Sequence, residues 1–223
     1  IYREPRGSRR SQILRRKPMR NLFIALIIFL IPSVASADVN VFACEPEWAA
    51  LAKEIGGDKT AVETAAGPRQ DPHHLRAKPS LLAAMRRADL VICSGASLEV
   101  GWLPILLQKS GGPQVQPGQP GNLAASDYVT RLEVPGRIDR SDGDIHPEGN
   151  PHIHLNPHNI ARVASELTKR LAQVDTANAP YYRGRYADFS KRWETATKRW
   201  EREASGLRGA RVITHHKSLT YLL

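Results

Sequence analysis

The sequence predicts an α/β fold with three parts: a lobe built on a parallel sheet, a long linking helix, and the start of a second α/β lobe. Short apolar segments alternate with helix-length amphipathic segments, which is typical of βαβ units. One unbroken helical pattern follows, and a new strand-like segment comes after it. We therefore expect the lobe at 38–174, the linking helix at 175–208, and an incomplete second lobe at 209–223.

The first lobe should contain four strands, because four short apolar segments are bounded by turn-forming residues. They lie at 38–43, 60–65, 89–93 and 128–134. Helices are expected between or after them, each with a proline near its first turn or a glycine pair at its end. These lie at 46–57, 78–88, 98–109 and 156–174, and the Pro-, Gly- and Gln-rich stretch 113–126 is expected to be a loop.

The linking helix is predicted from apolar side chains that recur every three or four residues, which places them on one helix face. This stripe comprises Tyr182, Tyr186, Phe189, Trp193, Ala196, Trp200 and Ala204. We expect the aromatic rings to pack in a core. A helix over 179–205 would be on the order of 40 Å long. A strand at 211–214 and the beginning of a helix should follow.

The charge is concentrated at the N-terminus. The chain has 223 residues and a formal net charge of +10, with hydrophobic and charged contents that are ordinary for a globular protein. Residues 1–37 contribute +7 of that charge, so the remainder is close to neutral. This distribution argues against a nucleic-acid partner.

Residues 19–37 have the pattern of a secretory signal peptide. Arg20 precedes an uncharged apolar run, Pro32 breaks the run, and a small-x-small site precedes Asp38. We expect cleavage before Asp38 and regard residues 1–18 as a disordered upstream extension. In an exported protein the two cysteines, Cys44 and Cys93, could form a disulfide or remain two buried thiols, and the sequence leaves both open.

The histidines indicate metal binding, because all eight fall in three clusters in loops that follow predicted strands. The clusters contain His73 and His74; His146, His152, His154 and His158; and His215 and His216. The carboxyl ends of parallel strands meet at one edge of a sheet, so these loops should converge. Imidazole is a preferred zinc ligand. Within the second cluster, His154 and His158 are the weaker candidates, and its mixture of acids and histidines could also collect metal at low affinity.

Several motifs together resemble the periplasmic solute-binding proteins of ABC-type zinc and manganese importers, closest to the zinc branch of the ZnuA and AztC type. The resemblance covers 39–223. Its motifs are Asp71-Pro72-His73, Ala88-Asp89-Leu90-Val91, Gly95-x-x-Leu98-Glu99-x-x-Trp102, Asn150-Pro151-His152-Ile153-x-Leu155-Asn156-Pro157-x-Asn159, and Thr214-His215-His216 followed by Tyr221. It implies two α/β lobes joined by one rigid helix, with the metal between them.

Carried over by motif position, the resemblance implies the ligands His73, His152 and His216, and an acidic fourth ligand beyond Leu223. His215, His154 and His146 are possible additional ligands. Three imidazoles favour Zn²⁺ over Mn²⁺, which prefers carboxylate oxygen. The implied protein is a monomeric periplasmic receptor, not an enzyme, whose partners are an ABC-type membrane permease and a candidate metallochaperone.

Two positions depart from the family pattern. An acidic-Pro pair often follows the first ligand in the family, whereas Leu75 to Pro79 stands here, and His154 occupies a position that is commonly aromatic. The alternatives are a manganese or iron receptor of the same family, a secreted zinc hydrolase, and an adhesin or storage protein of the same fold. A hydrolase would need a general base beside the metal. The sequence contains no HExxH, and Glu148 is the one glutamate next to a histidine cluster.

Overall fold

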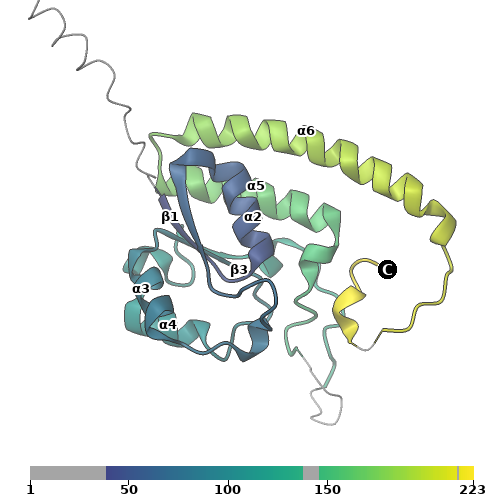
Figure 1. The fold of residues 1–223 in the computed structure, drawn as a ribbon, viewed down its shortest axis with the longest axis horizontal. Coiled ribbons are helices and arrows are strands. Elements are labelled where there is room, and N and C mark those ends of the chain that lie inside the picture. The colour runs from purple at the N-terminus through teal and green to yellow at the C-terminus, as the bar shows by residue number, and fades with distance from the viewer. Residues whose placement is uncertain (1–38, 138–145, 215) are drawn as a thin grey trace, which may run out of the picture. The chain divides into compact units, whose positions relative to one another are not determined.

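The structure, a computed structural model, describes residues 39–137, 146–214 and 216–223. The predicted signal peptide, the upstream extension and His215 lie outside these residues. Four parallel strands form one sheet in the order β2-β1-β3-β4 (Figure 1). The strands are β1 (Val39–Ala43), β2 (Thr60–Thr64), β3 (Leu90–Cys93) and β4 (Asn122–Ala124). This confirms the predicted parallel α/β class.

Helices cover both faces of the sheet, as apolar parallel strands require. They are α2 (Pro46–Gly56), α3 (Pro79–Arg87), α4 (Leu103–Ser110), α5 (Pro157–Val174) and α6 (Ala179–Ala204). Alternate side chains of β1 and β3 enter two separate cores. Val41 and Ile92 pack with α2, α5 and α6, whereas Phe42 and Val91 pack with α3 and α4. Every residue of β3 is buried, consistent with its interior position in the sheet.

Helix starts follow the sequence signals closely. Pro46, Pro79 and Pro157 each lie in the first turn of their helix, where the missing N–H is not needed. The Asn156 side chain accepts a hydrogen bond from the His158 N–H and caps α5. Helix α4 begins five residues later than expected, because Ala96 and Ser97 take positive φ angles and turn the chain before it.

The fourth strand is not where the sequence placed it. It forms at Asn122–Ala124, inside the stretch expected to be a loop, where the Asn122 side chain donates to the Val115 carbonyl and Leu123 is buried. Residues 129–134 have no regular structure and are mostly exposed. Their apolar-polar alternation imitates a half-buried strand, but β4 already occupies the position beside β3.

The long helix is present, and its apolar stripe is buried over the first half. Tyr182 and Phe189 are buried in the core shared with α2 and α5, and Trp193 packs against that core. Trp200 is 39% exposed. The predicted strand at 211–214 is irregular and exposed, since no described strand lies beside it to pair with. The expected final helix is one 3-10 turn, Lys217–Leu219.

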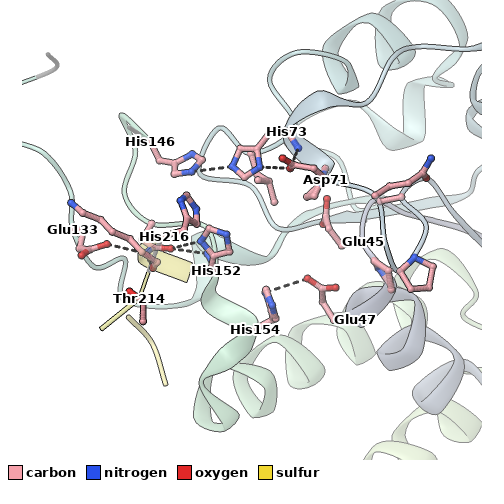
Figure 2. A pocket seen from close by; sticks show the side chains of 18 of the residues that line it. Glu45, Glu47, Asp71, His73, Glu133, His146, His152, His154, Thr214 and His216 are labelled. Atoms are coloured by element: carbon pink, nitrogen blue, oxygen red, sulfur yellow. Dashed lines mark hydrogen bonds and ion pairs between the residues drawn. The ribbon is translucent and has the colours of Figure 1, made fainter. Parts of the chain in front are cut away.

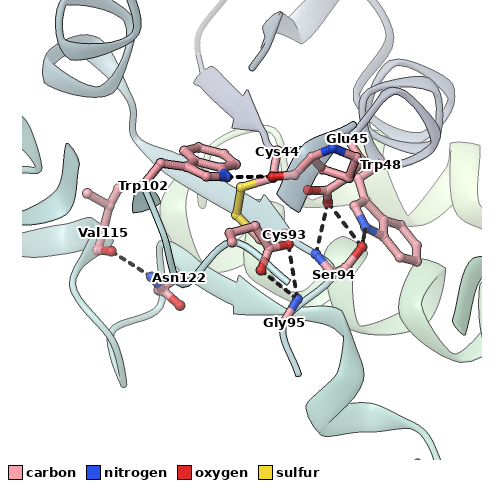
Figure 3. Close-up of a disulfide and its surroundings, with 11 residues drawn as sticks. Cys44, Glu45, Trp48, Cys93, Ser94, Gly95, Trp102, Val115 and Asn122 are labelled. Atoms are coloured by element: carbon pink, nitrogen blue, oxygen red, sulfur yellow. Dashed lines mark hydrogen bonds between the residues drawn. A yellow bond between two sulfur atoms is a disulfide. The ribbon is translucent and has the colours of Figure 1, made fainter. Parts of the chain in front are cut away.

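Cys44 and Cys93 form a disulfide, which settles the alternative that the sequence left open (Figure 3). It joins the residue after β1 to the last residue of β3, and both cysteines are buried in the core under α3 and α4. None of the helices in the described part of the chain combines the length and hydrophobicity that spanning a bilayer requires.

Candidate metal centre

A cleft of about 1250 Å³ opens at the carboxyl end of the sheet. The loops after β1, β2 and β3 form part of its wall, as expected for a parallel sheet. The remaining wall comes from the segments that carry Glu133, His146 and His152, and from the segment that carries His216. The cleft therefore gathers loops that are far apart in the sequence.

Four imidazoles come together in this cleft (Figure 2). The ring of His73 lies 5.0 Å from that of His146, 6.2 Å from that of His152 and 6.4 Å from that of His216, measured between ring centroids. The His152 and His216 rings are 5.3 Å apart, and the Nε2 atoms of His73 and His146 are 3.2 Å apart. The structure thus places the three ligands implied by motif position together, and two of the additional candidates, His146 and His154, line the same cleft.

Asp71 fixes the orientation of His73. Its Oδ1 accepts from the His73 backbone N–H at 2.9 Å and lies 2.6 Å from the ring Nδ1. The Asp71 side chain also caps the short turn Pro72–His74. With Nδ1 held by a carboxylate, Nε2 is the ring nitrogen presented to the cleft, an arrangement that commonly supports metal-binding histidines.

Asn150 fixes the orientation of His152 in the same way. Its Oδ1 accepts from the His152 backbone N–H at 3.0 Å and lies 2.8 Å from the ring Nδ1. Burial and the neighbouring imidazoles, His216 first among them, lower the pKa of His152 to about 4. This ring is therefore neutral and able to bind a metal ion at all but strongly acidic pH.

Of the remaining described histidines, His154 also lines the cleft, whereas His74 and His158 are not among its lining residues. His154 faces Glu47, with 3.2 Å between Nδ1 and Oε1, and its ring centroid is 6.3 Å from that of His152. Burial lowers the pKa of His154, against the opposing charge of Glu47. His158 contacts Glu201 on the surface at 2.8 Å. The His74 side chain is 82% exposed.

Sequence reasoning missed the acidic residues of the wall. Glu45 and Glu47 flank Pro46 directly after β1 and line the cleft beside the histidines (Figure 2). The rule that loops after parallel strands converge, applied to β1 as it was to the histidine loops, could have found both. Glu133 also lines the cleft, and its carboxylate accepts from the Asn150 side chain at 2.8 Å.

One pair of imidazole nitrogens has the spacing of two zinc ligands, because the Nε2 atoms of His73 and His146 are 3.2 Å apart. In the described part of the chain, one group of three potential ligand side chains has all its ligand atoms within 4.8 Å: Cys44, Cys93 and Glu99. The disulfide occupies both of those sulfur atoms. Nitrogens around a tetrahedral zinc ion are about 3.3 Å apart, given Zn–N bonds of about 2.0–2.1 Å. The separation of the His73 and His146 nitrogens matches this spacing.

The sequence model of one family, ZnuA, zinc-uptake complex component A periplasmic, matches residues 41–223. The chain belongs to this family. The family match includes the cleft and all four imidazoles, so the site lies within the part of the chain that family members share.

Two curated members of streptococcal origin illustrate the similarity. The metal ABC transporter substrate-binding lipoprotein ScbA of Streptococcus cristatus is 28% identical over 150 residues, which cover 66% of this chain and 45% of ScbA. The manganese ABC transporter substrate-binding lipoprotein PsaA of Streptococcus pneumoniae is 26% identical over 181 residues, covering 77% of this chain and 55% of PsaA. The chain spans about half the length of these curated relatives.

Solved structures show the same fold. A zinc-bound ZnuA with residues 138–173 deleted superposes with a TM-score of 0.68 at 26% identity, covering 82% of this chain and 65% of the other. The zinc-bound AdcA of Streptococcus pneumoniae matches with a TM-score of 0.64 at 20% identity, covering 83% of this chain and 37% of AdcA. At that identity the second likeness supports the fold alone.

Proposed function

We propose that this chain is a receptor that captures a divalent transition-metal ion outside the cytoplasm and passes it to an ABC-type permease for import. The observation that carries the proposal is the cluster of four imidazoles in one cleft, two of them oriented through Nδ1. Family membership supports the transport role, because the related proteins are named as ABC transporter substrate-binding lipoproteins.

The ligands in this proposal are His73, His152 and His216, and His146 is the imidazole able to complete a tetrahedron. An acidic side chain from beyond Leu223 is the alternative fourth ligand, as the family resemblance implies. His154 is assigned to Glu47 rather than to the metal, because the two side chains face each other across 3.2 Å. The site binds cargo and releases it, so no catalytic residue is assigned.

We propose zinc as the preferred ion, because an all-imidazole set suits Zn²⁺ better than Mn²⁺. Manganese is the second candidate, since PsaA is named for manganese. Competition between the two ions for one site distinguishes them. Zinc should displace manganese when both are present at equal concentration, and retention of manganese under those conditions would reverse the assignment.

Export is part of the proposal. Residues 19–37 are assigned as a cleaved signal peptide, which delivers a monomeric receptor to the periplasm, where a metallochaperone is a candidate donor of the ion. N-terminal sequencing of the exported protein should give Asp38 as the first residue. A first residue well upstream of Asp38 would contradict this assignment.

The site is tested by two matched substitutions. His152→Ala should weaken zinc binding roughly 100-fold or more, because it removes an oriented, neutral donor. His158→Ala removes a surface imidazole that contacts Glu201 and should leave zinc affinity unchanged. Isothermal titration with a competing chelator measures both. Equal effects of the two substitutions would refute the ligand assignment.

A further inference from the structure

His216 lines the cleft, but the residues that precede it do little to fix its position. Residues 209–214 have no regular structure and are exposed, and Ile213 is 100% exposed. The chain from the end of α6 to Thr214 therefore does not fix where His216 lies. Among the described residues, the contacts that fix it come from His216 itself and from the residues after it.

Tyr221 provides such a contact. Its side chain is 6% exposed and belongs to the core shared by α2, α5 and α6. The hydroxyl accepts a hydrogen bond from the Leu132 N–H at 2.9 Å and donates one to the Asn150 carbonyl at 2.9 Å. The Tyr221 hydroxyl thus joins the segment after His216 to two other segments, one at Leu132 and one at Asn150.

The bridged groups belong to the framework that orients His152. Asn150 holds the His152 ring through Oδ1, and its Nδ2 donates to the Glu133 carboxylate and to the Lys217 carbonyl, each at 2.8 Å. Lys217 directly follows His216. The Asn150 side chain and the Tyr221 hydroxyl therefore join the segment after His216 to the residue that orients His152.

We propose that the Tyr221 hydroxyl is a positioning group for the metal site, holding His216 at its 5.3 Å ring separation from His152. Tyr221 does not touch the ion. It acts by fixing the His216 segment to the Leu132 and Asn150 backbone, so that the imidazole is in place before metal arrives. This inference rests on the proposed function, because it assigns a role at the same site.

The competing explanation is that Tyr221 only anchors the end of the chain. Both explanations predict some loss of stability when the hydroxyl is removed, because the Leu132 N–H and the Asn150 carbonyl lose a buried partner. Only positioning predicts that the loss of metal affinity depends on His216. Coupling between two residues is measured by a double-mutant cycle.

Tyr221→Phe removes the hydroxyl and keeps the buried ring. We expect zinc affinity to fall about tenfold, because the two buried hydrogen bonds of the hydroxyl no longer hold the His216 segment. In a His216→Ala background the same substitution should produce no further fall. The visible spectrum of bound Co²⁺ should change with Tyr221→Phe, because one donor is displaced, and should be identical for His216→Ala with and without the second substitution.

Tyr182→Phe is the matched control. Tyr182 is buried in the same core, and its hydroxyl donates to Asp175 at 2.7 Å, away from the cleft. It should lower stability and leave zinc affinity unchanged. Equal affinity of Tyr221→Phe and the unaltered chain, or an undiminished effect in the His216→Ala background, would overturn the inference. Failure of the unaltered chain to bind zinc or manganese would instead refute the proposed function.

Discussion

At the scale of single residues, Asn150 has the most connections around the site. Its side chain orients His152 and contacts Glu133 and Lys217, and its backbone pairs with Leu132 and Tyr221. A side-chain amide offers two donors and one oxygen with two lone pairs, and Asn150 uses all of them within the protein. No other uncharged side chain of this size supplies two N–H donors together with an oxygen that accepts two hydrogen bonds.

Asn150→Ala should weaken zinc binding by about 10- to 100-fold, because the His152 ring loses the group that fixes its tautomer and orientation. Asn159→Ala is the matched control. Asn159 is also buried, and its Nδ2 donates to the Ile153 carbonyl without contacting a histidine ring. Asn159→Ala should lower the free energy of unfolding but leave zinc affinity unchanged. Titration of both variants with zinc measures the difference, and equal affinities would argue against an orienting role.

Two buried carboxyl groups, those of Glu45 in the cleft wall and of its neighbour Glu99, interact with each other. Glu45 is 2% exposed and accepts from the Ser94 N–H and hydroxyl (Figure 3). Glu99 accepts from the Gly95 N–H. Burial, together with the negative charges of Glu99 and Glu47, raises the pKa of Glu45 well above its usual value. Burial also raises the pKa of Glu99. Ionisation of either carboxyl group therefore places charge in an environment that disfavours it.

Glu45→Gln should stabilise the protein at alkaline pH. Between the ordinary pKa and the raised one, the native state binds more protons than the unfolded state, so stability falls as pH rises through that range. The amide keeps an acceptor for Ser94 and never ionises, so the variant should lose less stability between pH 5 and pH 9. Urea unfolding across this range is the measurement. A steeper loss in the variant than in the unaltered chain would contradict the assignment.

At the scale of elements, α6 shows how a sequence pattern can be correct over part of its length. Its first half packs on α2 and α5, and Trp193 donates from its indole N–H to the Pro157 carbonyl at 2.8 Å. Further along, Thr197 is 6% exposed, and its hydroxyl has no hydrogen-bond partner in the described part of the chain. An unsatisfied buried hydroxyl lowers stability.

Thr197→Val should therefore raise the free energy of unfolding, by about 1 kcal/mol. Thr168→Val is the matched control, because Thr168 is equally buried in α5 but its hydroxyl donates to the Ala164 carbonyl at 2.7 Å. The control should not gain stability. Chemical denaturation of the two variants gives both values, and a destabilised Thr197→Val would show that its hydroxyl finds a partner.

At the scale of the whole molecule, the disulfide ties the interior of the sheet together. Cys44 and Cys93 are separated by 49 residues and connect β1 with β3, so the bond constrains a long loop of the unfolded chain. It also fixes the ends of the strands that lead to Glu45, in the cleft wall, and to Ser94, which donates to Glu45.

Reduction should lower the stability of the unaltered chain by about 2–4 kcal/mol. A variant with both Cys44→Ser and Cys93→Ser should be less stable from the start and insensitive to a reducing agent. Denaturant unfolding with and without reductant measures this. Equal stability of oxidised and reduced protein would mean that the bond adds nothing beyond the packing around it.

The sequence by itself determined the parallel α/β class, most helix starts and the long helix, because proline position, apolar periodicity and helix caps are local signals. It also predicted that histidines from its three clusters would meet, since loops after parallel strands converge, and His73, His146, His152 and His216 do line one cleft. Tertiary structure decided which segment forms the fourth strand, because only one segment can pair with the edge of β3 that β1 leaves free. It also decided that Cys44 and Cys93 bond, that His146 joins the cluster while His154 faces Glu47, and that Tyr221 reaches Asn150. These outcomes depend on which segments distant in the chain are brought into contact, and no local pattern encodes that.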